Sequence, residues 1–447
     1  MEQPKQSSIA FSRRDVLRLG AAAAAGHFIL PRDVRAAESF TWRRFAGQKI
    51  FVHFIKIPWA ATIQQMLPEF EKQTGITVEF SELGEIQARQ KLTIEFTGGS
   101  SGIDAFFTSL HVEKRRFAKS GWYLDLSKYL KDPTMTAPDY QWTDIMASVR
   151  EAVTQPDGTI SALPLGMSPN ILAYRKDLFE QKGLQPPTTL AEMEEVARKL
   201  HNPPNMYGFV ARGLKNANAP SWDWVLFSMG GYFMTKEGRA SIVTPEAVKA
   251  MDYYAGMLRR FAPPGVVNFN WYECQSAFMQ GQVTMYFDST NSMTQIEDKE
   301  KSRVAGKVGY AVPPAGPGGR FSVGGTDGVA ISSQSKVPGP AYFFAQWATS
   351  KQPAIRAHVA GVGSVRLSVW DSPLVEAEAK KLAPGWAKTY LESTKITRLQ
   401  TPEIVAVSEY RDIIGLAIQK AIEGATSEAV LAEAQKDFQE LLDKTER

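Results

Sequence analysis

The 447-residue sequence has one cysteine and no apolar run of about 18 residues, the length of a membrane-spanning helix. A single thiol cannot form an internal disulfide, so the fold must rest on a hydrophobic core. Hydrophobic residues make up 44% of the chain, which is enough for two or three globular units of ordinary size. We expect Cys274 to be packed in that core rather than to act as a nucleophile.

Catalytic and cofactor motifs are missing as well. None of the five histidines stands in an HExxH motif or beside the cysteine, which argues against a zinc site. The sequence has no GxxxxGK[ST] or GxGxxG motif, so phosphate-binding loops are not indicated. We predict that the protein uses no cofactor, binds no metal and is not an enzyme. A glycosidase that uses two carboxylates stays open, because such pairs have no fixed spacing.

The chain begins with a leader that includes "SRRDVLRLGAAAAAGHFILPRDVRAA". Arg13 and Arg14 precede a short apolar core, and small residues follow near Ala36, as in a twin-arginine export signal. We predict that residues 1–37 are this signal peptide and that the folded protein reaches the periplasm. The alternative is an alanine-rich N-terminal helix buried in the fold.

Most of the net positive charge lies in the leader. Residues 1–37 contain six basic and three acidic side chains, so of the net charge of +4 only about +1 remains for the rest. A nearly neutral surface gives no reason to expect a nucleic acid or an anionic membrane as partner.

Strand and helix patterns alternate from residue 48 onward. "KIFVHFI", "ITVEFS" and "IDAFFTS" read as strands, and helical patterns separate them. Further on, "TLAEMEEVARKL" predicts a helix with a capping box from Thr189 to Glu192. This order predicts an α/β fold with a mostly parallel sheet, in two units joined near residue 150.

Several aromatic, charged and glycine residues fall at expected loops and element ends. Flat Trp faces stack on the C–H face of a sugar, charged side chains bind hydroxyls, and glycines allow close backbone approach. These features favour a neutral polyhydroxylated ligand. The candidate residues are Trp222, Trp224, Trp271, Asp288, Gly324, Gly325, Asp327 and Arg366.

Each candidate also has a structural interpretation. One of Trp222 and Trp224 belongs in the core if their segment is extended, since period two places them on opposite faces. Asp288 is placed to cap a following helix, and Asp327 to serve a turn. Arg366 has the alternative of pairing with a surface acid.

The chain resembles the family 1 extracellular solute-binding proteins, the periplasmic receptors of carbohydrate ABC importers. The likeness covers the whole chain after the leader, and four segments carry it: "MLPEFEKQTGITVEF", "LPLGMSPNILAYRKDLFEQKGLQPPTTLAEM", "AFMQGQVTMYF" and "GGTDGVAISSQSKVPGPAYFFAQWATS". "EIQARQKLTIEFTGGSSGIDAFFTS" is similar to receptors for polyols such as mannitol and sorbitol. The twin-arginine leader departs from the secretory route that most relatives use.

The resemblance implies a two-lobe periplasmic-binding-protein fold whose discontinuous lobes are joined by hinge crossovers. One lobe would hold residues 38–150 plus 314–350, and the other 151–313 plus 351–447, with "GPGGRFSVGGTDG" as a crossover. The family pattern adds Thr108 to the cleft candidates. The implied function is that of a monomeric receptor, which captures a sugar or polyol and docks transiently on a permease. A receptor for an amine or a metal chelate is the third possibility, and it would need an anionic cleft or exposed histidines.

Overall fold

A computed structural model describes residues 39–99, 102–293, 295–375, 385–399 and 401–446. The predicted leader, residues 1–37, lies outside the described residues. Residues 40–447 form one compact unit, and everything below concerns that unit. No helix among the described residues has both the length and the apolar character needed to cross a membrane.

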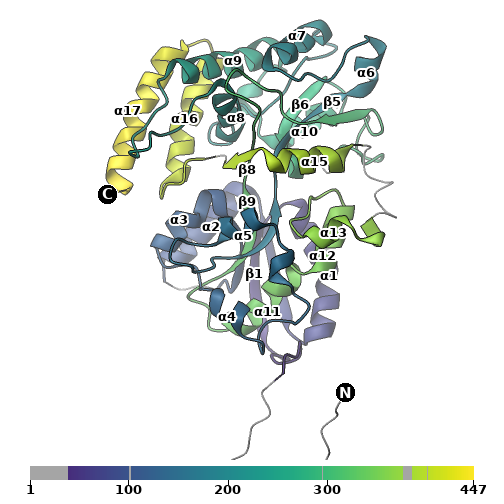
Figure 1. Ribbon diagram of the computed structural model, residues 1–447, viewed down its shortest axis with the longest axis vertical. Coiled ribbons are helices and arrows are strands. Elements are labelled where there is room, and N and C mark those ends of the chain that lie inside the picture. Colours follow the sequence, from purple (N-terminus) through teal and green to yellow (C-terminus); the bar gives the residue numbers. More distant parts are fainter. Residues whose placement is uncertain (1–38, 100–101, 294, 376–384, 400, 447) are drawn as a thin grey trace, which may run out of the picture. The chain divides into compact units, whose positions relative to one another are not determined.

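One sheet has five strands in the order β2-β1-β3-β9-β4, and Figure 1 labels its strands β1 and β9. β1 is parallel to β2 and β3, whereas β9 is antiparallel to both β3 and β4. Four of the five strands therefore point the same way, as predicted. The strands are β1 (Lys49–Ile55), β2 (Thr77–Leu83), β3 (Ala105–Ser109), β4 (Leu163–Met167) and β9 (Thr326–Ile331).

Helices cover both faces of this sheet, because successive strand residues point to opposite sides. In β3, Phe107 joins the core beneath one helical layer and Phe106 joins the core beneath the other. The first layer consists of α1 (Pro58–Thr74), α11 (Pro338–Ala348) and α12 (Lys351–Val359). The second consists of α2 (Glu85–Thr97), α3 (Leu110–Lys119) and α5 (Ala147–Val153). Short elements nearby are α4 (Ser127–Lys131), η1 (Trp142–Asp144) and α13 (Leu367–Trp370).

A second group of elements surrounds an antiparallel sheet of order β6-β5-β7 and has its own core. Cys274 is buried in that core, as predicted. Its strands are β5 (Asn170–Arg175), β6 (Met285–Ser289) and β7 (Val308–Ala311). We call the elements around the five-stranded sheet the first lobe and this group the second lobe.

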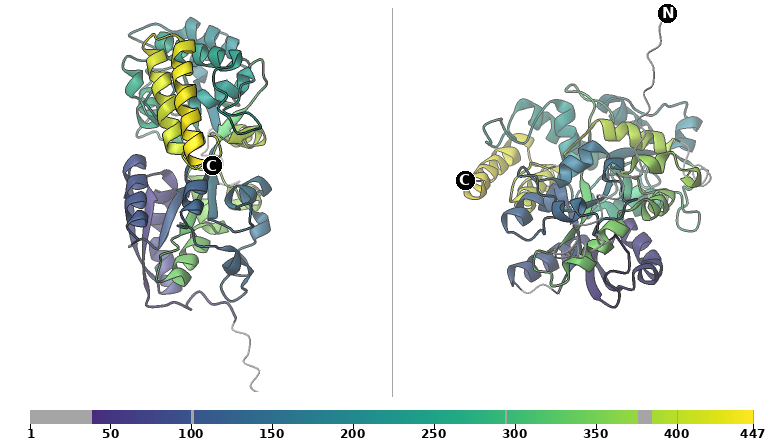
Figure 2. Two further views of the ribbon diagram at one scale, coloured as in Figure 1. Left: turned by 90° about the vertical axis from the view of Figure 1, so that its left-hand side faces the viewer. Right: turned by 60° about the horizontal axis from the view of Figure 1, so that its bottom comes forward.

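The helices of the second lobe include the predicted helix with its capping box, since Thr189 and Glu192 make both capping hydrogen bonds. Figure 2 shows α16 and α17 packed side by side over this lobe. The helices are α6 (Lys176–Gln181), α7 (Leu190–Leu200), α8 (Ala219–Met229), α9 (Pro245–Phe261), α10 (Trp271–Met279), α15 (Trp386–Lys395), α16 (Val407–Ile422) and α17 (Ser427–Thr445). Two 3-10 turns, η2 (Val266–Asn268) and η3 (Thr290–Met293), accompany them.

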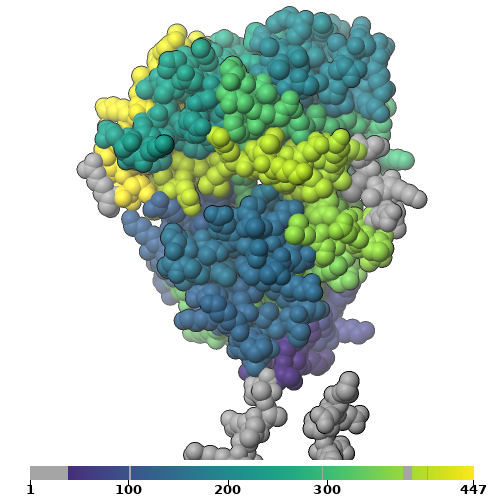
Figure 3. All heavy atoms as spheres, in the orientation of Figure 1, coloured from purple at the N-terminus to yellow at the C-terminus, as the bar shows by residue number. Residues whose placement is uncertain are grey.

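The chain passes between the lobes at two places that bear on the site. β4 of the first sheet is followed directly by β5 of the second, and β8 (Ser322–Gly324) is followed by β9. β8 pairs with β10 (Thr397–Leu399), so Gly325 stands at the point of crossing. The hydroxyl of Tyr390, a residue of α15, also donates to the carbonyl of Met167 in β4, at 2.7 Å. Figure 3 shows the yellow-green segment that holds α15 as a band between the lobes.

Several elements depart from the predicted lobe limits, and β4 and α12 are two of them. β4 follows the predicted boundary at residue 150, yet it pairs with β9, because its buried leucines belong to the core of the first sheet. α12 follows the predicted boundary at residue 350, yet it packs against α1. Both elements belong to the first lobe. The other predicted limits stay a prediction.

The buried amide of Gln346 in α11 generates a prediction about stability. Its oxygen accepts the N–H of Ala137 and its nitrogen donates to the carbonyl of Met135, both at 2.9 Å. Gln346→Ala leaves both backbone groups unpaired, so we expect the free energy of unfolding to fall by about 2–4 kcal/mol. Urea denaturation measures this change.

The exposed Gln90 on α2 provides the control, since Gln90→Ala should change the free energy of unfolding by no more than about 0.5 kcal/mol. Equal stability of the two variants would contradict the role given to the Gln346 amide.

Candidate functional site

A cavity of about 110 Å³ lies between the lobes. It is found where β1 and β3 of the first sheet end and where β5 begins in the second lobe. Its polar and aromatic lining comes from both lobes. The first lobe contributes Glu85, Arg89, Ser109, His111 and Asp327, and the second contributes Asn170, Arg212, Trp271, Ser289, Asn291, Ser292 and Arg411.

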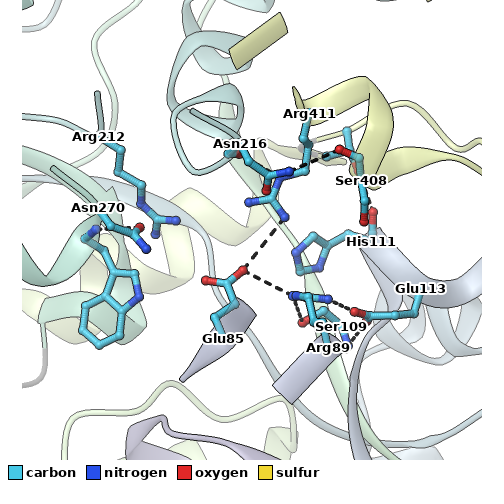
Figure 4. A network of polar contacts seen from close by, with 12 residues as sticks. Glu85, Arg89, Ser109, His111, Glu113, Arg212, Asn216, Asn270, Ser408 and Arg411 are labelled. Carbon is cyan, nitrogen blue, oxygen red and sulfur yellow. Dashed lines mark hydrogen bonds and ion pairs between the residues drawn. The ribbon is translucent and has the colours of Figure 1, made fainter. Parts of the chain in front are cut away.

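Glu85 and Arg89 stand at the start of α2, one helical turn apart, so their side chains share a face. The Arg89 guanidinium lies 3.4 Å from the Glu85 carboxylate and donates to the Ser109 hydroxyl at 3.2 Å. It also forms an ion pair with Glu113, whose carboxylate accepts the N–H of Ser109 at 2.6 Å. Glu113 thereby satisfies the first turn of α3 and fixes Arg89 at the cavity wall (Figure 4).

Two further guanidinium groups reach Glu85 from the second lobe. Arg411 on α16 lies 3.9 Å from the Glu85 carboxylate, and its Nε donates to the carbonyl of Asn216 at 3.0 Å. Arg212 is paired with Asp288, to which its Nε donates at 2.8 Å. Figure 4 shows the Glu85 carboxylate between Arg212 on one side and Arg89 and Arg411 on the other.

These contacts determine the ionisation of the site. Burial disfavours the Glu85 carboxylate, but the charges of Arg89 and Arg411 outweigh this and lower its pKa to about 2. Burial lowers the pKa of Arg411 to about 10. For Arg212, the attraction of Asp288 exceeds the effect of burial, so its pKa is raised. Glu85 is therefore ionised, and both arginines are cationic, at neutral pH.

Asp327 and His111 face the same space, and at neutral pH the first is about half protonated and the second is neutral. Burial raises the pKa of Asp327 to about 7, although a hydrogen bond with Ser109 and the charge of Arg89 offset part of the shift. Burial, together with Arg89 and Arg411, lowers the pKa of His111 to about 3. A half-protonated carboxyl and a neutral imidazole can each donate to or accept from a hydroxyl group.

Trp271 provides an aromatic surface. It opens α10, where Asn270 and Glu273 form a capping box that determines how the chain enters the helix. Its ring stacks on Tyr272 with 3.5 Å between the ring centres. The indole is thus held rigidly at the cavity, as stacking on a sugar or polyol carbon chain requires.

Three of the predicted site residues line this cavity: Trp271, Gly325 and Asp327. Asp288 does not line the cavity. It is fully buried behind Arg212, with which it forms an ion pair. Asp288 also accepts the N–H of Ser289, but Ser289 is the last residue of β6, so this bond does not cap a helix that starts there.

The other predicted residues have partners away from the lining. Trp222 and Trp224 are both buried in the helix α8, so the segment is not extended and both residues, rather than one of them, belong to the core. Trp224 stacks on Phe287 with 3.9 Å between ring centres. A contact of either Trp with a ligand stays a prediction.

Thr108, Gly324 and Arg366 likewise lie outside the lining. Thr108 shares a 2.7 Å hydrogen bond with the hydroxyl of Tyr123. Gly324 lies in β8, paired with β10. Arg366 is buried 3.2 Å from Asp144, so its acid partner is largely buried rather than on the surface. Their contact with a ligand also stays a prediction.

The sequence reading missed Glu85, Arg89, Arg212 and Arg411, which carry most of the charge of the site. The pair Glu85 and Arg89 has a signal, the i,i+4 spacing of opposite charges at a helix start, but many solvent-exposed helices share it. Arg212 and Arg411 lie far apart in the chain, and only the fold brings them together. Among the described residues no group of three His, Cys, Asp or Glu side chains is placed to hold a metal ion.

Known proteins similar to this chain are solute-binding proteins. The profile of the bacterial extracellular solute-binding protein family matches residues 57–355. An erythritol/L-threitol-binding protein of Mycolicibacterium smegmatis is 26% identical over 383 residues, which are 81% of this chain and 80% of that protein. A mannitol-binding protein of Pseudomonas aeruginosa is 28% identical over 396 residues, which are 82% of this chain and 86% of that protein.

A solved structure extends the likeness to the fold. The solute-binding protein of an Agrobacterium radiobacter ABC transporter, in complex with ribitol, superposes with a TM-score of 0.79. The two chains are 28% identical, and the match covers 89% of this chain and 99% of that one.

The ionisation of Asp327 predicts how stability depends on pH. Its pKa is about 7 in the folded chain and takes the ordinary value of 3.8 when unfolded, so the folded state retains a proton between these values. Because the folded state binds this proton more tightly, Asp327 lowers the free energy of unfolding as the pH rises from about 4 to about 7. Asp327→Asn cannot ionise, so its stability relative to the wild type should increase across that window and level off above it.

Thermal unfolding of the two proteins at a series of pH values measures this difference. The buried His53 and His111 shift stability in the opposite sense, but they are present in both proteins and drop out of the comparison. A difference that does not change between pH 4 and 7 would contradict the burial of an ionisable Asp327.

Proposed function

Because the chain belongs to the bacterial extracellular solute-binding protein family, we propose that it captures a small neutral polyol in the cavity around Glu85. Members of this family are substrate-binding receptors and not enzymes, so the two-carboxylate hydrolase is set aside. The observation that carries the proposal is the lining itself. It combines fixed hydrogen-bonding groups, the aromatic residues Phe107 and Trp271, and balanced charge.

The lining suits hydroxyl groups better than a charged ligand. Arg89 is paired with Glu113 and Arg212 with Asp288, while Arg411 faces Glu85. A neutral ligand leaves these pairs intact and adds charge-assisted hydrogen bonds to their free oxygens and N–H groups. The chemistry is that of an alditol or a monosaccharide, with the carbon chain against Trp271.

The size of the cavity and the relatives narrow the ligand further. A buried water needs roughly 10–15 Å³ of such space, so the cavity, at about 110 Å³, holds several water-sized groups. Relatives at 26–28% identity are named for erythritol, L-threitol and mannitol, and a structure at 28% identity contains ribitol. A single polyol is therefore the proposed ligand, rather than an oligosaccharide.

The mechanism follows from the division of the site between lobes. The first lobe supplies Glu85 and Asp327, and the second supplies Arg212, Trp271 and Arg411. A ligand that contacts both sets binds the closed arrangement more tightly than an open one, so it shifts the population toward closure. The crossings at residues 168–169 and 325 are the proposed hinges. The closed receptor, a periplasmic monomer exported by the twin-arginine route, would then dock on its permease.

Ligand binding tests the proposal directly. We expect one or a few of erythritol, L-threitol, ribitol, D-mannitol and D-sorbitol to raise the melting temperature of residues 38–447. At 100 times the dissociation constant the stabilisation should be about 2.7 kcal/mol, which corresponds to several degrees. Isothermal titration calorimetry then gives the affinity.

Trp271→Ala should weaken binding of the best polyol by at least about tenfold, because a rigid stacking face is lost. The control is Tyr232→Ala, which removes an exposed aromatic residue that is not part of the cavity lining and should leave the affinity unchanged. If the folded wild type binds none of the polyols and monosaccharides, the proposed ligand class is wrong.

A further inference from the structure

The charged residues of the cavity lining and their partners balance only if Glu85 is included. The cations are Arg89, Arg212 and Arg411, and the anions are Glu85, Glu113 and Asp288. Glu113 and Asp288 are each committed to one arginine and lie behind it. Glu85 is the carboxylate that lies in the lining itself and faces guanidinium groups of both lobes.

Other titratable groups around the lining add little charge at mildly acidic pH. Asp327, with a pKa near 7, is largely protonated at pH 6, and His111, with a pKa near 3, is neutral. Burial raises the pKa of the Asp223 carboxyl, which senses the charge of Arg411, well above its ordinary value. The charges that matter at pH 6 are therefore those of the three arginines and of Glu85, Glu113 and Asp288.

We propose that Glu85 is the residue that makes this receptor select neutral polyols against the corresponding sugar acids. Its carboxylate lies 3.4 Å from Arg89 and 3.9 Å from Arg411, which is the space where an anionic ligand would seek these guanidinium groups. An aldonate brought there would meet Glu85 as a like charge in a mostly buried site, where repulsion is poorly screened. A neutral hydroxyl meets the same carboxylate as a hydrogen-bond acceptor.

The proposal rests on the function proposed above and makes Glu85 both an attractive and a repulsive element. Selectivity of this kind needs a feature that penalises the wrong ligand, not only contacts that favour the right one. Without the Glu85 charge, three largely buried arginines face two carboxylates, and the cavity has an unbalanced positive charge. Such a site is complementary to a carboxylate.

The test compares D-mannitol with D-mannonate, which differ at one end by a carboxylate in place of a hydroxymethyl group. Calorimetric titrations at pH 6 use the wild type, E85Q and E85D. E85Q keeps the shape of the side chain and removes its charge, whereas E85D keeps the charge. We expect E85Q to gain mannonate affinity by roughly tenfold to a hundredfold and to lose mannitol affinity, whereas E85D should gain none for mannonate.

E95Q is the matched control, because Glu95 is on the same helix and pairs with Lys91, at 3.4 Å, outside the cavity lining. It should behave as the wild type toward both ligands. Circular dichroism checks that each variant is folded, and E85S, which also removes the charge, replaces E85Q if that variant does not fold.

The outcomes separate this proposal from the proposed function. Mannonate binding that is tight in the wild type, absent from E85Q, or gained equally by E85D overturns the role of the Glu85 charge. A wild type that binds no polyol overturns the proposed ligand class, yet the gain of mannonate by E85Q still decides the charge proposal, because it depends on the cavity alone.

Discussion

The Glu85 carboxylate lies among three guanidinium groups inside a small cavity, and the arrangement of the site depends on keeping those charges balanced. A buried cation without a partner is costly, so each arginine needs a carboxylate close by. Glu113 and Asp288 serve two of them from within the same lobe. Glu85 serves the third across the cavity, so one ion-pair network connects α2 of the first lobe with α16 of the second.

The secondary structure around the network explains why these side chains are held still. Glu113 accepts the N–H of Ser109 at the start of α3, and Asn270 and Glu273 cap the helix that begins with Trp271. Both anchors are helix starts, where backbone N–H groups need acceptors in any case. The groups that meet the ligand are therefore orientated by the same hydrogen bonds that begin the helices, and little conformational entropy is left to lose on binding.

The sequence predicts the fold better than it predicts the site. Periodicity located β1, β2 and β3, whereas the crossover in the glycine-rich stretch before Asp327 was implied by the family resemblance and not by the residue pattern. Trp271 was found because it opens a helix after a loop. Trp222 and Trp224 show the limit of such reasoning: aromatic residues beside glycines look alike whether a helix buries them or a cleft exposes them. The arginines of the cavity come from three helices or loops far apart in the chain, and only tertiary structure reveals their common carboxylate.

A crystal structure with the polyol that stabilises the protein most would test the account most directly. We expect ligand density in the cavity, with hydroxyl groups within hydrogen-bond distance of Glu85 and at least one of Arg212 and Arg411, and with the carbon chain against Trp271. Ligand density elsewhere, with Glu85 and the arginines still paired only to one another, would contradict it.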